Sequence, residues 1–254
     1  MAKTMLFYNT VTPLLKDKHV NLKFKPFTSA KFAADVNLIP IAGQEFVNAS
    51  LDYPILFVKE TDPEGKTRFV PLVLLGITKD KNDFIDENDQ WRSSTYLPAF
   101  VRRYPFILAK QDGGEFEFAV CIDTDCENVN EKEGTPLFDD KGEPSEFLNQ
   151  QINFLNSFNA EIGRTAEFGE KLNQLNVMEN QPIKVQAPNG VTVNLQDFWI
   201  INPAKFSEIP AKDLEDMNKN GTLGWVFFHY ASLNNLTRLM DRFIAAGNAS
   251  ALKK

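Results

Sequence analysis

One apolar stripe, in residues 144–175, most constrains how this chain can fold. Its side chains, mostly apolar, recur at steps of three and four residues, which places them on one face of an α-helix. They are Leu148, Ile152, Leu155, Phe158, Ile162, Thr165, Phe168, Leu172 and Leu175. Pro144 suits the first turn, and Gly163 and Gly169 weaken the helix without ending it. The stripe predicts a long helix packed on the protein's own sheet, with a seam between two copies as the alternative.

The chain before this helix has the pattern of antiparallel strands. Residues 53–59 and 68–77 are apolar and β-favouring, and the turn sequence DPEG at 62–65 separates them, so they predict a hairpin. Pro71 is expected at a sheet edge or a bulge, because proline cannot donate a ladder hydrogen bond. Short alternation of strands and helices is absent, which argues against a parallel doubly wound sheet.

Further local elements are predicted in the same half. Residues 104–110 and 115–122 predict a second hairpin about an Asp-Gly-Gly turn. Residues 29–35 and 44–49 are expected to form short helices, with Ser29 as an N-cap. Residues 123–142 are acidic and have no periodicity, so they predict a long loop.

That loop separates two compositional halves. Residues 1–140 are rich in predicted strands and residues 141–254 in predicted helices. We expect the two halves to pack as one compact unit, because 254 residues with 43% hydrophobic content can bury a sizeable core.

Four elements are expected after the long helix. They are a hairpin of residues 182–186 and 191–194 about a Pro-Asn-Gly turn, a strand at 198–201, a short helix from Ser207 or Pro210 through Lys219, and a final helix over residues 230–246. Leu214 and Met217 should face inward, Gly221 should end the short helix, and residues 248–254 should fray. The predicted fold class is α+β: a mainly antiparallel sheet with a long amphipathic helix and a C-terminal helix packed on it.

Charge and hydropathy exclude two classes of protein. The formal net charge is −7 and the basic residues are scattered, whereas nucleic-acid binding needs a concentrated basic surface. The longest apolar runs, residues 69–77 and 225–228, fall far short of the roughly 20 residues of a membrane helix. The first ten residues hold too short an apolar patch for a signal peptide, so a cytoplasmic protein is expected.

The sequence predicts no metal and no cofactor. Cys121 and Cys126 have no second ligand pair for zinc and are expected to be reduced, partly buried thiols. Residues 123–127 begin like a calcium loop, but Asn128 stands where that loop needs glycine. An iron site would need both histidines, His19 and His229, which lie near opposite ends of the chain without a neighbouring carboxylate motif.

Residues 91–106, WRSSTYLPAFVRRYPF, combine aromatic residues, two prolines and three arginines, as a ligand site would. Arg102 or Arg103 would bind a carboxylate or phosphate, and Trp91 and Tyr104 would form an aromatic wall. Because adjacent side chains of a strand point to opposite faces, only one arginine would serve the site. Alternatively, the arginines pair with the acidic residues 123–133 and have a purely structural role.

Two further residues complete the candidate set. Asp123 begins the acidic loop, and His229 follows an apolar run, where a hydrogen-bonded core histidine is the favoured interpretation over a ligand or general base. No glycine-rich phosphate loop, nucleophile elbow or HExxH motif is present, so no catalytic residue is assigned.

Several segments together resemble the bacterial SapC family. They are residues 21–24, 32–34, 70–77, Trp91 with 96–106, 121–123, 134–139, 142–145, 220–223 and His229 with 232–236. Their order and spacing extend the resemblance over nearly the whole chain.

The resemblance implies no agreed biochemical activity. The family's name comes from association with a bacterial surface layer, and related genes often lie near flavin-dependent halogenase-like proteins, cupin-like proteins and outer-membrane receptors. We therefore expect an accessory protein that binds a small anionic or aromatic ligand beside a halogenase- or cupin-type partner. The alternatives are an enzyme that uses Asp123, Cys121 or His229 near the two arginines, and a surface-layer structural protein that assembles through the long helix.

Overall fold

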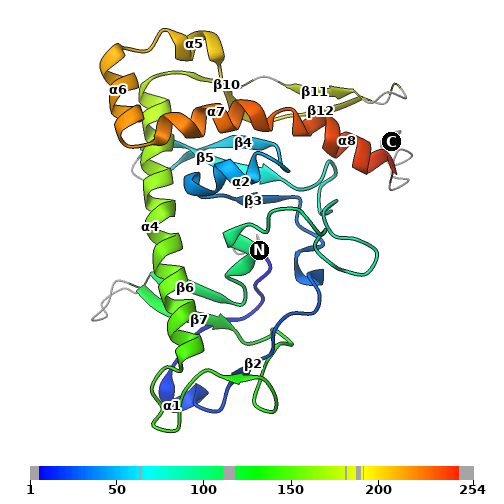
Figure 1. Ribbon diagram of the computed structural model, residues 1–254, viewed down its shortest axis with the longest axis vertical. Coiled ribbons are helices and arrows are strands. Elements are labelled where there is room, and N and C mark those ends of the chain that lie inside the picture. Colours follow the sequence, from blue (N-terminus) through cyan, green and yellow to red (C-terminus); the bar gives the residue numbers. More distant parts are fainter. Residues whose placement is uncertain are drawn as a thin grey trace.

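The computed structural model describes residues 6–62, 65–110, 118–180, 182–186, 190 and 192–245, and it confirms an α+β fold. Its strands are β1 (Val11–Pro13), β2 (Lys23–Phe24), β3 (Leu38–Pro40), β4 (Ile55–Thr61), β5 (Thr67–Leu74), β6 (Phe106–Lys110), β7 (Phe118–Asp123), β8 (Val129–Asn130), β9 (Thr135–Pro136), β10 (Met178–Asn180), β11 (Ile183–Gln186), β12 (Thr192–Leu195) and β13 (Trp199–Ile201). All their pairings are antiparallel, in sheets ordered β10-β13-β4-β5-β3, β1-β7-β6, β8-β2-β9 and β11-β12 (Figure 1).

The longer helices lie in the C-terminal half of the chain. They are α1 (Lys16–His19), the 3₁₀ turns η1 (Lys31–Ala33) and η2 (Gly43–Glu45), α2 (Phe46–Ala49), α3 (Ala99–Arg102), α4 (Glu146–Gln174), α5 (Pro203–Ser207), α6 (Ala211–Lys219), α7 (Thr222–Ser232) and α8 (Asn235–Ala245). Ser29 accepts the Lys31 N–H at 3.1 Å, but the N-cap of this 3₁₀ turn is Ala30, so the cap predicted at Ser29 is wrong. None of the described helices is long and apolar enough to cross a membrane.

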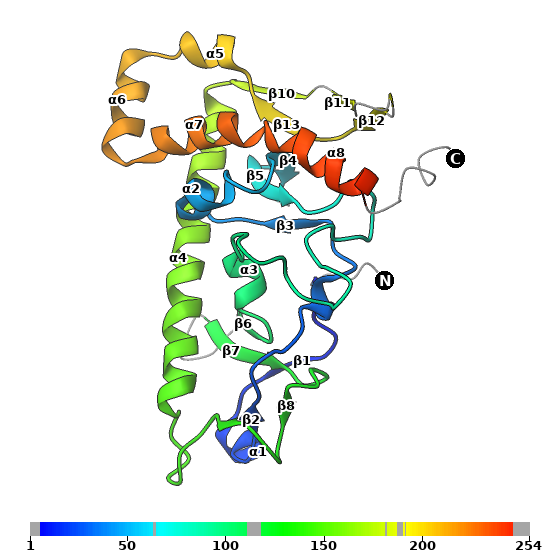
Figure 2. The same cartoon turned by 45° about the vertical axis from the view of Figure 1, so that its right-hand side comes forward.

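The long helix α4 is the axis of the molecule (Figures 1 and 2). It packs on β5 of the five-stranded sheet near its C-terminal end and on β6 of a three-stranded sheet nearer its start. The Ser145 hydroxyl accepts the Leu148 N–H at 3.2 Å and caps the helix, so Pro144 lies before the cap and not in the first turn as predicted. The predicted stripe faces these sheets and includes the buried Leu155 and Leu172.

Two glycines let backbone segments approach closely around α4. A Cβ at Gly169 would lie 2.0 Å from the carbonyl oxygen of Phe69 in β5. A Cβ at Gly43 would lie 2.3 Å from the ring of Trp225, and the Gly43 N–H donates to the Thr165 hydroxyl of α4 at 2.8 Å. These positions fix how close η2, α4 and α7 can pack.

The predicted hairpin of β4 and β5 forms, with Phe57 opposite Pro71. The edge position predicted for Pro71 is wrong, because β5 lies between β4 and β3. The proline is tolerated because β3 pairs with β5 only as far as Leu72, and the Pro71 carbonyl still accepts the Ile41 N–H at 3.2 Å.

The second predicted hairpin also forms, as β6 and β7, with Ile107 opposite Cys121. Its Asp-Gly-Gly turn at 112–114 lies outside the described residues, as do parts of the turns at 62–65 and 188–190 and all of 248–254. The predicted loop at 123–142 is in part wrong, because β8 and β9 within it both pair with β2. Strands of two residues are too short to show a period in the sequence.

The C-terminal region contains the predicted hairpin of β11 and β12 and the strand β13. The single final helix predicted for residues 230–246 is wrong: α7 ends at Ser232 and α8 begins at Asn235. Met217 of α6 is buried as predicted, but Leu214 is 41% exposed.

Candidate functional site

Tyr104 occupies the centre of the best-formed candidate site. Pro98 has extended backbone angles and precedes the single turn of α3, after which Arg103 and Tyr104 lead into β6. The prediction that Arg102 and Arg103 lie on a strand is therefore wrong, because a prolyl N-cap begins a helical turn there. The turn directs Tyr104 inward, and its side chain is buried.

The Tyr104 ring packs against several aromatic side chains. It stacks on Phe32 at a centroid distance of 4.5 Å and on Phe27 at 5.5 Å, and it meets Tyr8 edge-on at 5.2 Å. Phe27 and Phe32 are themselves 4.9 Å apart and stay partly exposed. This leaves aromatic surface open to solvent at the side of a buried ring.

Asp123 and Cys126 surround the Tyr104 hydroxyl, which donates to a carboxylate oxygen of Asp123 at 3.3 Å. Burial raises the pKa of Tyr104, and the hydrogen bonds and charges of Cys126 and Asp123 raise it further. Burial also raises the pKa of the Cys126 thiol. Both groups are therefore protonated at neutral pH and are poor nucleophiles.

The Asp123 carboxylate is fully buried and is held by backbone donors. It accepts the N–H groups of Asn9 and Thr10, each at 2.9 Å, and that of Asp125 at 3.2 Å. These bonds join the N-terminal segment to the end of β7. Asp123 therefore holds the backbone around the site in place and does not line the site itself.

A pocket of about 360 Å³, here named the Tyr104 pocket, opens above these groups. Besides Tyr104 and Cys126, its lining contains Asn9, Phe27, Thr28, Ser29, Lys31, Phe32, Asp125, Glu127 and Asn128. Lys31, Asp125 and Glu127 are exposed, so one ammonium and two carboxylates stand around an aromatic wall. This volume and mixture suit a small organic ligand.

Arg103 lies behind the pocket among aromatic rings. Its guanidinium carbon is 4.0 Å from the ring centre of Phe100, 5.5 Å from that of Phe158 and 5.8 Å from that of Tyr8. Its buried Nε has no hydrogen-bond partner, and burial lowers its pKa, an effect that Tyr8 partly offsets. Burial raises the pKa of Tyr8 to about 12.

Arg102 is exposed and contacts a different set of groups. Its Nε donates to the Leu97 carbonyl at 3.1 Å, and its guanidinium carbon lies 5.1 Å from the ring centre of Phe154. Among the described residues, no ion pair joins Arg102 or Arg103 to the acidic segment 123–133. The predicted pairing is therefore wrong, because both guanidiniums are engaged by rings and carbonyl groups instead.

Trp91 and His229 lie in other parts of the molecule. The Trp91 indole donates to the Tyr53 hydroxyl at 3.2 Å and stacks on Phe84 at 6.5 Å, so it does not share the wall of Tyr104. His229 lies within α7 and not before a helix as predicted, because α7 begins at Thr222.

Both ring nitrogens of His229 are engaged by backbone groups. Nδ1 lies 2.8 Å from the Ile55 carbonyl, and Nε2 accepts the Ile201 N–H at 3.2 Å, a pattern that only the neutral ring with a proton on Nδ1 satisfies. Burial lowers the pKa of His229 to about 4. It is the hydrogen-bonded core histidine that the sequence favours.

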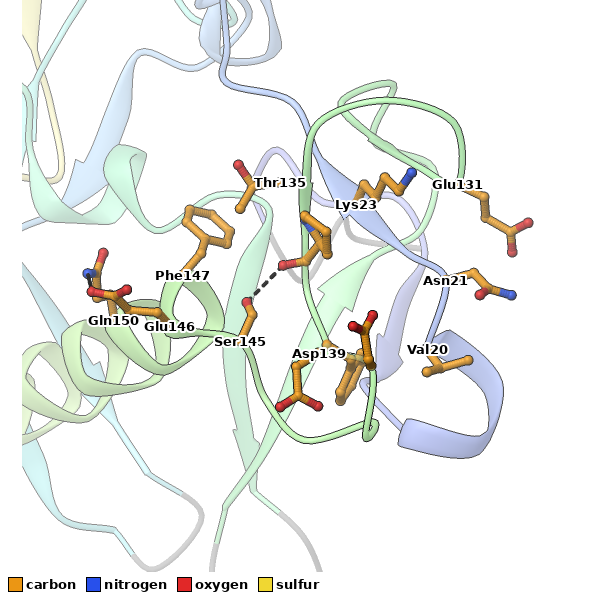
Figure 3. Close-up of a pocket in the computed structure, with 13 residues that line it drawn as sticks. Val20, Asn21, Lys23, Glu131, Thr135, Asp139, Ser145, Glu146, Phe147 and Gln150 are labelled. Carbon is orange, nitrogen blue, oxygen red and sulfur yellow. Dashed lines mark hydrogen bonds between the residues drawn. The ribbon is translucent and has the colours of Figure 1, made fainter.

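A larger depression lies elsewhere, where β2, β9 and the start of α4 meet, and has a volume of about 970 Å³ (Figure 3). Several of its polar groups are engaged in local structure: Ser145 donates to the Pro136 carbonyl at 2.8 Å, and Asp139 accepts the N–H groups of Lys141 and Glu143. The Tyr104 pocket is favoured as the functional site because the pKa values of two of its lining residues, Tyr104 and Cys126, are raised.

No metal site is evident in the described part of the chain, where no group of three or more His, Cys, Asp or Glu side chains could hold an ion. The calcium-like start at 123–127 folds differently, because Asp123 accepts backbone hydrogen bonds and Cys126 is buried. Cys121 and Cys126 are both free and buried.

Sequence reasoning found Tyr104 but missed the residues that make its pocket. Phe27, Lys31 and Phe32 come from residues 24–32, FKPFTSAKF, where three phenylalanines alternate with lysines. That interleaving of aromatic and basic residues was the sequence signal that could have identified the pocket residues. It could not show that the segment lies against Tyr104, about 70 residues further on.

Comparison with known proteins gives one match. A family model described as SapC matches residues 14–239 and so includes most of the Tyr104 pocket. No curated protein and no solved structure matches the chain.

Proposed function

Since this chain belongs to the SapC family, we propose that it is an accessory protein that binds a small aromatic ligand in the Tyr104 pocket. The observation that carries the proposal is the partly exposed aromatic wall of Phe27 and Phe32 beside the buried Tyr104 ring. Aromatic rings prefer stacked or edge-on contacts with other rings. A planar aromatic ligand would therefore stack on Phe27 and Phe32, which already pack against Tyr104.

The charges at the rim narrow the ligand class. Asp125 and Glu127 provide two carboxylates and Lys31 one ammonium, so a ligand that bears an amino group gains from the excess negative charge. A ligand that also bears a carboxylate can use Lys31. An aromatic amine or an aromatic amino acid therefore fits better than the purely anionic ligand suggested by the arginines.

Binding is favoured over catalysis by the state of the reactive groups. The pKa values of Tyr104, Cys126 and Cys121 are all raised by burial, and both nitrogens of His229 are occupied. A general base needs a free lone pair within hydrogen-bond reach of the substrate. Asp123, Cys121 and His229, the three groups of the enzymatic alternative, do not line this pocket.

The accessory role extends the proposal beyond the site. We place the protein in the cytoplasm beside a halogenase- or cupin-type partner, as the family resemblance implies. Two free buried thiols suit a reducing compartment. Co-purification of such a partner with the tagged chain supports this role, and its recovery only from a surface-layer fraction argues for the structural alternative.

A binding experiment tests the ligand proposal directly. Isothermal calorimetry and thermal shift are measured with phenylethylamine, L-phenylalanine and phenylacetate, which share a benzyl group and carry different charged groups. We expect the two amines to bind and the acid to bind more weakly. Asp125→Asn combined with Glu127→Gln should raise the Kd for phenylethylamine about tenfold, as two weakened charge contacts allow.

Two controls make the outcome interpretable. Lys18→Ala changes an exposed lysine of α1 outside the pocket lining and should leave binding intact. Phe32→Leu removes a stacked ring and should weaken all three probes. If none of the probes binds to the wild-type chain, or if the pocket variants bind as well as Lys18→Ala, the proposal is wrong.

A further inference from the structure

Three arginines lie near Trp91, and only Arg92 belongs to the segment 91–106 that the sequence pattern singled out. Arg92 follows Trp91 in the loop between β5 and α3, and Arg238 and Arg242 lie one turn apart on α8, which runs beside that loop (Figure 2). Arg242 makes the connection, since its guanidinium carbon lies 4.3 Å from the ring centre of Phe84, on which Trp91 stacks. These three residues are named here the arginine cluster.

Each arginine is held in place and keeps donors free. The Nε of Arg92 donates to the Asp83 carbonyl at 3.1 Å. One terminal nitrogen of Arg238 donates to the Leu51 carbonyl at 3.3 Å and to Asn235 Oδ1 at 3.2 Å. Within the described parts of the chain, the other nitrogens of these two planar groups make no hydrogen bond, as a preorganised oxyanion site requires.

Arg242 is half-buried and has one buried donor without a partner. Its Nη1 is buried and makes no hydrogen bond. Among the described residues, none of the three arginines forms an ion pair. An orphaned buried donor is rare in folded proteins, and a bound oxyanion would give it an acceptor.

The charges around Arg242 favour the binding of an anion. Burial lowers the pKa of Arg242, and the neighbouring Arg92 and Arg238 lower it further, while Asp52 opposes them. Asp83 is neutralised in part by Lys81, whose ammonium lies 3.8 Å away. Counting Lys81, four cations stand against the two carboxylates of Asp52 and Asp83, which leaves a local positive excess in a chain whose formal net charge is −7.

We propose that the arginine cluster binds one phosphate or carboxylate group beside the indole of Trp91. The site differs from the Tyr104 pocket in every residue, so either proposal can fail alone. The buried rings of Tyr53 and Phe84 form its floor, and their contact at 4.5 Å keeps it rigid. The oxyanion supplies an acceptor to Arg242 Nη1 and reduces the electrostatic repulsion among the three arginines.

Tryptophan fluorescence and thermal shift with inorganic phosphate test this site, with acetate as the carboxylate probe and sodium chloride at matched ionic strength as the control for screening. We expect a saturable effect of phosphate or acetate that chloride does not reproduce, and the stronger of the two identifies the source of the oxyanion. The affected emission should be lost in Trp91→Phe.

Charge-removing variants decide the role of the arginines. Arg92→Gln changes an exposed side chain and should raise the Kd at least tenfold, as should Arg242→Gln. Arg68→Gln, an exposed arginine of β5 that pairs with Glu60, is the matched control and should bind normally. Arg242→Met should also raise the Tm without any anion, because it removes a repelled buried charge.

Three outcomes overturn the proposal. One is the absence of a saturable response to both probes in the wild-type chain, and another is equal binding by Arg92→Gln and Arg68→Gln. The third is a response that chloride reproduces at equal ionic strength, which shows screening alone.

Discussion

Gly169 of α4 lies against the carbonyl oxygen of Phe69 in β5 so closely that a Cβ would be 2.0 Å from it. The contact fixes the distance between the long helix and the five-stranded sheet. Gly163, six residues earlier on the same helix, has no heavy atom within 4 Å of the equivalent Cβ position. The two glycines therefore provide a matched pair for testing what holds helix and sheet together.

Gly169→Ala should destabilise the protein by about 1–3 kcal/mol, because either the helix or the strand must move to admit the methyl group. Gly163→Ala should stabilise it by about 0.5–1 kcal/mol, since alanine is the better helix former at an open position. Urea unfolding of both variants measures the difference. Equal effects in the two variants would mean that the close contact is not maintained in solution.

His229 should make the stability depend on pH. Its pKa is about 4 in the folded chain against an ordinary value of 6.5, so between these pH values the unfolded chain binds a proton that the folded chain does not. The free energy of unfolding should therefore fall as the pH is lowered from 6.5 to about 4. The expected loss is about 3 kcal/mol at most.

The measurement is urea unfolding across this pH range for the wild type and for His229→Gln. The variant should be less stable at pH 7, because it loses the bond to Ile55 or to Ile201, but its stability should vary less with pH. His19→Gln, which changes the partly exposed histidine of α1, is the control for losing a histidine elsewhere in the chain. Identical pH profiles of His229→Gln and the wild type would falsify the assignment.

Arg103 should stabilise the fold through its packing and not through its charge. Its guanidinium lies over Phe100 without an ion pair among the described residues, so Arg103→Met keeps most contacts and removes a desolvated charge. We expect Arg103→Met to change the stability by less than about 1 kcal/mol and Arg103→Ala to lower it by about 2–3 kcal/mol. Thermal unfolding distinguishes the two, and a larger loss in the methionine variant would show that the charge itself is needed.

We propose that the strand-rich and helix-rich halves unfold as one unit, because α4 packs on both β5 and β6. Leu148→Ala at one end of the helix and Leu172→Ala at the other, both buried, should each lower one shared unfolding midpoint by removing about 2–5 kcal/mol.

Probes in different sheets can follow that transition. Trp199 emission reports on the five-stranded sheet, and the reactivity of the Cys121 thiol reports on β7. Coincident midpoints are expected for one cooperative unit. Two separate midpoints would show that the halves are independent domains.

The parts of the fold that were predictable are those with a long period or strong turn signals. The stripe from Leu148 to Leu175 predicted α4, and alternating runs around polar turns predicted three hairpins. The break between α7 and α8 was missed because Leu233 and Leu236 continue the apolar spacing through it, with no glycine or proline to mark the end.

The site was less predictable because its residues meet only in three dimensions. The segment 91–106 identified Tyr104, but the same residues distribute to three places: Trp91 beside Phe84, Arg102 at the surface and Tyr104 in its pocket. A proline-capped turn, not a strand, causes this separation. Neither Phe32 nor Arg242 could be assigned a neighbour without knowing that geometry.

The contact between Gly43 and Trp225 has a consequence for how SapC sequences can diverge. The indole fills the space that any side chain at position 43 would need, and Arg164 covers the ring at 4.7 Å. A relative that gains a side chain at position 43 should have exchanged the tryptophan for a smaller residue, whereas either change alone would leave an overlap or a void. Positions 43 and 225 should therefore vary as a pair across the family, although 182 residues separate them in the chain.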